Sequence, residues 1–122
     1  MELARRTTIG LLLCLSAPIL QAAEPYLGRF LYQYEGGDIY RITVPDDTHM
    51  TWECVACPEP GTRAQETPDR FRIAEGIYFV SWLEASGVSV TQVVDLNAMK
   101  VWSTVIDGPG RYVIRGDIVR EQ

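Results

Sequence analysis

The chain has 122 residues, which is enough for one domain, and it carries a formal net charge of −5. Its 11 Lys and Arg residues are outnumbered by 16 Asp and Glu residues, and Lys100 is the single lysine. The absence of any basic cluster argues against nucleic acid as a partner.

A secretory signal peptide is predicted over residues 1–23. Arg5-Arg6 forms a short basic region, and the apolar run from Ile9 to Leu20 is too short to span a bilayer. Small residues, including Ala22-Ala23, follow where a signal peptidase would cut. We therefore expect a periplasmic or secreted protein with a mature domain at 24–122 and no later membrane span. A retained N-terminal anchor is the alternative.

The mature domain is predicted to consist of short β-strands, because runs rich in β-branched and aromatic residues alternate with turn residues. Gly36-Gly37 supplies the first tight hairpin, since glycine accepts the positive φ that such a turn requires. The stretch Cys57–Pro68 is rich in proline and is expected to be a loop with a short strand. The expected strands, in chain order, are Arg29–Tyr34, Ile39–Val44, His49–Cys54, Arg63–Glu66, Arg70–Ala74, Ile77–Glu84, Val88–Asp95, Lys100–Ile106 and Arg111–Val119.

This pattern predicts an all-β fold. Successive strands with tight turns indicate a small antiparallel up-and-down β-barrel of about eight strands, since closure removes exposed edges. A barrel of this size has room for its own side chains or for one small ligand.

Side chains alternate between the two faces of a strand, so Tyr32 and Tyr34 share one face and Trp82 and Glu84 share another. If the face of Trp82 points inward, Glu84 loses water, and its pKa should rise, which suits a proton donor. For the two tyrosines, cross-strand packing in the hairpin is the alternative to a pocket role.

Cys54 and Cys57 form the single cysteine pair of the mature domain and are predicted to form a local disulfide in an oxidising compartment. Redox catalysis would need this motif at a helix start, and zinc would need four ligands. His49 follows Asp46-Asp47, which favours a turn-capping or surface role. The sequence also offers no nucleophile elbow for a catalytic triad and no phosphate-binding glycine loop. Neither a metal nor a cofactor is expected.

Two stretches, FLYQYEGGDIYR (30–41) and YFVSWLEASGVSVTQVVD (78–95), resemble the MoaF-like family and the related phenolic acid decarboxylases. The resemblance covers most of the mature chain: a tyrosine-rich hairpin, a third strand with a tryptophan, a loop, an S-W-x-E strand and V-x-x-V-x-D. It implies a calycin, or lipocalin-like, barrel.

The decarboxylases grip the substrate carboxylate with two first-strand tyrosines and move protons with a glutamate after the S-W pair. These positions match Tyr32, Tyr34 and Glu84. The family's third-strand arginine falls at or near Glu53, and this departure disfavours decarboxylation. Another arginine would have to reach inward instead, and the candidates are Arg41, Arg63, Arg70 and Arg72.

We therefore predict an exported domain that binds a small aromatic or amphipathic molecule, with Tyr32, Tyr34, Trp82 and Glu84 in the pocket wall. Tyr40 is expected to be structural. The first alternative is a decarboxylase-type lyase in which Glu84, Tyr32 and Tyr34 are catalytic.

A second alternative is an interaction domain whose barrel is plugged by its own side chains. In that case Trp52, Trp82 and Trp102 would fill the lumen. The sequence leaves the ligand and the oligomeric state open.

Overall fold

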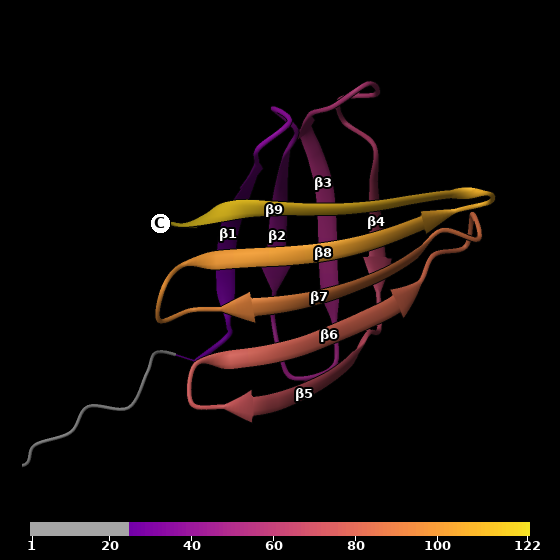
Figure 1. Cartoon of the computed structure of the whole chain (residues 1–122). Coiled ribbons are helices and arrows are strands. Elements are labelled where there is room, and N and C mark those ends of the chain that lie inside the picture. Colours follow the sequence, from indigo (N-terminus) through magenta and orange to yellow (C-terminus); the bar gives the residue numbers. More distant parts are fainter. Residues whose placement is uncertain (1–24) are drawn as a thin grey trace, which may run out of the picture.

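The computed structural model describes residues 25–122, and the predicted signal peptide therefore lies outside the described residues. Within them the chain forms nine strands and no helix, in agreement with the all-β prediction (Figure 1). The strands are β1 (Gly28–Tyr34), β2 (Ile39–Val44), β3 (Met50–Ala56), β4 (Arg63–Glu66), β5 (Asp69–Ala74), β6 (Ile77–Leu83), β7 (Ser89–Asp95), β8 (Lys100–Asp107) and β9 (Gly110–Glu121).

All strand pairs are antiparallel and belong to one sheet with the order β4-β3-β2-β1-β9-β8-β7-β6-β5. The sheet curls on itself, so that β1–β4 run across the back of β5–β9 (Figure 1). β4 and β5 follow one another in the chain but occupy opposite ends of the strand order and do not pair. The fold is therefore a curled antiparallel sheet of nine strands that forms a half-barrel. The sequence predicted a closed barrel of about eight strands.

The curl depends on β9, which is 12 residues long and belongs to both layers. Its second half pairs with β1 and its first half pairs with β8. The two ladders overlap at Gly116 and Asp117, and Gly116 pairs with both Tyr34 and Val101. A Cβ atom at Gly116 would lie 2.7 Å from the backbone oxygen of Gln33. Glycine thus allows β1 and β9 to approach closely where the sheet bends.

The core lies between the two layers of the curled sheet. β1 supplies three of its largest side chains, because Phe30, Tyr32 and Tyr34 alternate onto one face of the strand and this face points inward. The other buried members of the core are Tyr26, Ile42, Val44, Met50, Val80, Val94, Val101 and Ile118. On the opposite face, Phe71 and Leu83 are exposed.

Seven of the nine expected strands differ from the structure by one or two residues at one or both ends, and two of these differences affect residues named above. β3 continues to Ala56, so Cys54 lies inside the strand, because its N–H and C=O extend the hairpin to Thr62 and Gly61. β6 ends at Leu83, and Glu84 begins the tight turn that leads to β7. No helix within residues 25–122 is long and apolar enough to cross a membrane.

Candidate functional site

A cleft lies at the end of the half-barrel to which the β1–β2, β3–β4, β6–β7 and β8–β9 turns contribute wall residues. Its volume is about 620 Å³. Aliphatic and proline side chains form part of the wall: Ile42, Pro58, Val88, Val90, Val105 and Ile114. The interior of the half-barrel is therefore open at this end, and the buried core side chains occupy the rest of it.

Aromatic side chains form much of the remaining wall. They are Tyr34, Tyr40, Trp52, Trp82 and Tyr112. Tyr40 makes edge contacts with Tyr34 and Trp52, at ring-centroid distances of 6.3 Å and 6.1 Å. These edge-on contacts hold the rings at defined angles around the cleft.

A small polar network lies among these rings. Gln92 of β7 donates through Nε2 to the hydroxyl of Tyr34 at 3.1 Å, and that hydroxyl lies 3.0 Å from the Oγ atom of Ser103 on β8. All three side chains are buried, and all three line the cleft. The Gln92 Oε1 atom is buried without a hydrogen-bond partner. Burial raises the pKa of Tyr34, so this phenol stays neutral.

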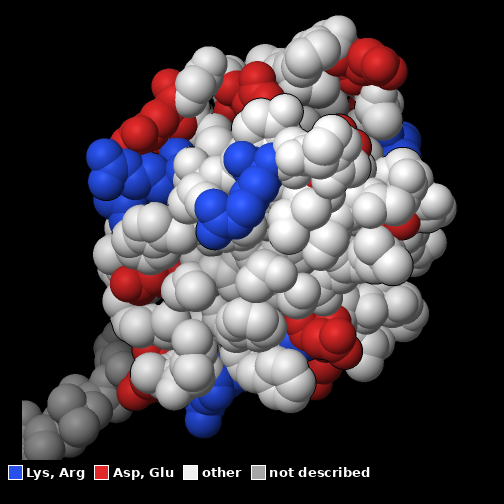
Figure 2. Space-filling view, turned by 45° about the vertical axis from the view of Figure 1, so that its right-hand side comes forward, with Lys and Arg blue, Asp and Glu red and all other residues white. Residues whose placement is uncertain are grey.

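The charged side chains of the cleft wall are acidic: Asp38, Glu84 and Asp107. Acidic side chains also stand along the upper edge of the molecule in Figure 2. Loss of water raises the pKa of Glu84, and the neighbouring carboxylates of Glu66 and Asp107 raise it further. Trp82 counteracts this effect by donating its indole N–H to Glu84 Oε2 at 3.2 Å.

The structure brings three of the four predicted pocket residues together, since Tyr34, Trp82 and Glu84 all line the cleft. It places Tyr32 deeper in the core. The Tyr32 hydroxyl lies 2.5 Å from the hydroxyl of Tyr26. Both phenols are fully buried, and burial raises the pKa of Tyr26 to about 12.

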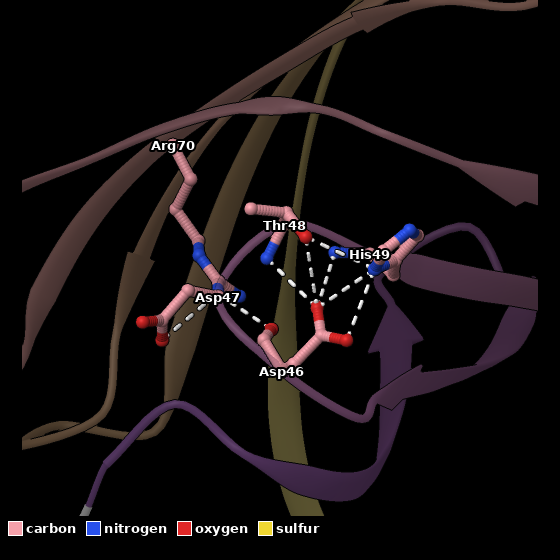
Figure 3. Close-up of polar contacts among 5 residues, drawn as sticks. All are labelled: Asp46, Asp47, Thr48, His49 and Arg70. Carbon is pink, nitrogen blue, oxygen red and sulfur yellow. Dashed lines mark hydrogen bonds and ion pairs between the residues drawn. The ribbon is translucent and has the colours of Figure 1, made fainter.

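A polar cluster lies at the β2–β3 turn, at the opposite ends of β2 and β3 from the cleft (Figure 3). The Asp46 carboxylate accepts hydrogen bonds from the backbone N–H groups of Thr48 and His49, at 2.9 Å and 2.8 Å. These bonds and the His49 ring lower the pKa of Asp46. The structure thus places His49 in a turn, as the sequence suggested.

Arg70 reaches inward at this far end rather than at the cleft. Its guanidinium donates to the backbone oxygen of Asp46 at 2.7 Å (Figure 3). It also lies 5.4 Å from the ring centre of Tyr26. The guanidinium of Arg41 donates a hydrogen bond to the carboxylate of Glu53 at 3.2 Å, and neither Arg41 nor Glu53 lines the cleft. Among the described residues, no Arg or Lys contributes to the cleft wall.

A second cavity of about 480 Å³ adjoins the cleft and shares Tyr40, Trp52, Pro58 and Glu84 with it. The predicted disulfide joins Cys54 to Cys57 beside this cavity, with the Cα atoms 6.0 Å apart. Its position next to Pro58 ties the β3–β4 connection to the wall of the cleft.

Three further polar side chains line the cleft, although they are not among the predicted pocket residues. Gln92 lies between Val90 and Val94 on an inward face, where a polar residue is unusual. Ser103 lines the cleft as well, and so does Tyr40, which is expected from the sequence to be structural. No group of His, Cys, Asp and Glu in residues 25–122 is arranged to hold a metal ion.

Trp102 does not fill the interior. It is 42% exposed, whereas Trp52 and Trp82 border a cleft that stays open. The three tryptophans therefore do not act together as a plug.

Comparisons with known proteins bear on the family and the fold. No curated protein matches the chain significantly. A crystal structure from Burkholderia vietnamiensis, described as that of a candidate beta-lactamase, aligns with a TM-score of 0.73 and 18% sequence identity. The alignment covers 83% of this chain and all of that one, and at this identity it shows a common fold alone. The family model described as MoaF-like matches residues 28–119, and the chain therefore belongs to the MoaF-like family.

Proposed function

We propose that this domain binds a small amphipathic molecule, with an aromatic or similarly planar part, in the cleft. The observation that carries the proposal is an open cleft whose wall combines aromatic and aliphatic side chains with a few buried polar groups. Small-molecule sites in proteins have this composition, and their volumes run from about 300 to 1,000 Å³. The volume of about 620 Å³ falls inside that range.

Binding is a better proposal than decarboxylation. A lyase of the kind that the sequence resembles would use two tyrosine hydroxyls and a cation on the substrate carboxylate. Here the hydroxyl of Tyr32 is paired with Tyr26, away from the cleft, and Arg70 lies beside the same pair. Glu84 retains a raised pKa that would suit a proton donor, but a carboxylate substrate would meet acidic neighbours.

The proposal extends to the compartment and to the wider fold group. We infer that residues 1–23 direct export to the periplasm or the outside, where a disulfide such as Cys54–Cys57 persists. We also infer kinship with the calycin barrels, supported by the curled antiparallel sheet and its cleft at one end.

The test is a titration of residues 24–122 with N-phenyl-1-naphthylamine, a neutral aromatic dye whose fluorescence rises in apolar surroundings. We expect saturable enhancement. Ile114→Trp, which fills the cleft from β9, should weaken binding about tenfold, equivalent to about 1.4 kcal/mol. Val113→Trp is the matched control, because Val113 is 63% exposed and lines neither cavity.

An absence of saturation would refute the proposed function. Equal weakening by the two tryptophan variants would place the dye somewhere other than the cleft, and would refute it as well.

A further inference from the structure

Gln92 presents an unmet hydrogen-bonding requirement inside the cleft. Its side chain is only 4% exposed, and Nε2 is engaged by Tyr34 at 3.1 Å. Oε1 has no partner. A buried carbonyl oxygen that cannot reach a donor is costly, and native proteins rarely leave one unbonded. Since Gln92 lines the cleft, a ligand that offers an N–H or O–H group would satisfy it.

The charge of the cleft wall determines whether a cationic, neutral or anionic hydrogen-bond donor is favoured as the ligand. Within the described part of the chain, its ionisable wall residues other than tyrosines are Asp38, Glu84 and Asp107. Carboxylates bordering a partly dry cleft attract cations and repel anions, and the chain's net charge of −5 acts in the same direction.

The aromatic wall favours the same sign of charge. The faces of tyrosine and tryptophan rings carry negative electrostatic potential and attract organic cations. Trp82 lies next to the acid, since its indole N–H bonds Glu84. The aromatic rings and the carboxylates therefore both attract a positively charged ligand. Gln92 Oε1 can accept a hydrogen bond from the N–H group of that ligand.

We propose that the ligand is a protonated arylalkyl amine, whose N–H donates to Gln92 Oε1 while the carboxylates and rings of the cleft stabilise its charge. This inference rests on the proposed function and deepens it by naming the chemical class of the ligand. It differs from the aromatic acid that the decarboxylase resemblance implies.

A set of four probes on one phenethyl frame separates charge from hydrogen-bond donation. They are 2-phenylethylamine (a cation with N–H), its N,N,N-trimethyl derivative (a cation without N–H), 2-phenylethanol (neutral) and 3-phenylpropionate (an anion). Displacement of N-phenyl-1-naphthylamine at pH 7 gives each affinity. We expect 2-phenylethylamine to bind about tenfold more tightly than 2-phenylethanol, and 3-phenylpropionate to bind most weakly. The trimethyl derivative should lose about fivefold relative to 2-phenylethylamine.

Two cleft variants and one control locate the effect. Gln92→Leu should abolish the difference between the two cations, because it removes the acceptor. Glu84→Gln should weaken the binding of both cations about fivefold and leave the binding of 2-phenylethanol unchanged. This test remains valid even if the Gln92→Leu variant fails to fold. Asp69→Asn makes the same change in net charge at an exposed residue that lines neither cavity, and should change nothing.

The outcomes separate this inference from the proposed function. If 3-phenylpropionate binds as tightly as 2-phenylethylamine, or if Glu84→Gln behaves like Asp69→Asn, the ligand is not a cation and the inference is wrong. The same holds if the dye binds in the cleft but none of the four probes displaces it. If the dye itself does not bind, the proposed function fails, and this inference fails with it.

Discussion

The hydroxyls of Tyr34 and Ser103 lie 3.0 Å apart, although their strands, β1 and β8, are not neighbours. β9 lies between them in the sheet, so the bond crosses the interior of the curl. Gln92 adds a third strand to the same point. One phenol oxygen thus links three strands beside the cleft.

Removing this oxygen should lower stability. Tyr34→Phe leaves Ser103 and the Nε2 atom of Gln92 buried without this partner, so we expect the free energy of unfolding to fall by about 1–3 kcal/mol. Urea unfolding measures the change. Tyr112→Phe is the control, because Tyr112 is 57% exposed and should lose less than about 0.5 kcal/mol. Equal losses in the two variants would show that the network contributes no stability.

Gly116 should tolerate no larger residue. In Gly116→Ala the new methyl group meets backbone atoms of Gln33 and Tyr34, at 2.7 Å and 3.1 Å, and backbone cannot rotate away. We expect a loss of about 1–3 kcal/mol, measured by thermal or urea unfolding. Gly36→Ala is the control, since its Cβ would meet nothing within 4 Å. If both alanine variants unfold alike, β1 and β9 can separate without cost.

Glu84 should make stability depend on pH. Its pKa is raised in the folded state above the ordinary 4.5, mainly by loss of water. The folded state therefore holds the proton more tightly than the unfolded state. The stability from this group is fully present below pH 4.5 and is lost as pH rises through the folded pKa.

Glu84→Gln removes this titration. We expect the variant to be more stable than the parent at pH 7, by less than about 1 kcal/mol because Glu84 is partly exposed, and the difference should disappear near pH 4. Urea unfolding across this pH range, with Asp69→Asn for comparison, measures the effect. A parent protein that is more stable than Glu84→Gln at pH 7 would contradict it.

The disulfide should contribute modestly to the free energy of unfolding, and it should also help to hold the wall of the cleft in place. Its closed loop contains four residues, so chain entropy assigns it about 2 kcal/mol. Replacing Cys54 and Cys57 together with alanine should lower the free energy of unfolding by about that amount. Dye binding should weaken as well, because Pro58, next to Cys57, lines the cleft. Dye affinity unchanged in the double variant would show that the loop holds its place without the bond.

Much of the fold follows from sequence pattern, because local rules govern it. Alternation places Tyr32 and Tyr34 on one face of their strand, which the structure shows to be the inward face, and turn residues separate the strands near their observed limits. The open edges were harder to predict. The sequence predicts β4 with its observed limits, but the failure of β4 to pair with β5 depends on how the whole sheet curls.

The site was less predictable, because alternation gives the face of a residue but not its depth. Tyr32 and Tyr34 point the same way, yet they lie about 7 Å apart along the strand, enough to put one in the core and one in the cleft. Gln92 could have been found as a polar residue on a valine face. Its unbonded oxygen depends on contacts from β1 and β8, which no local pattern contains.

The strand order also has a consequence for the time course of folding. Every pairing among the described strands joins consecutive segments, except that of β1 with β9, which closes roughly 80 residues of chain. The hairpins can form as soon as they leave the ribosome, but β1 must wait for the last strand to be synthesised. Until then one edge of the strand that carries the largest core side chains stays unpaired, and a chain truncated before Gly116 would keep that edge open permanently.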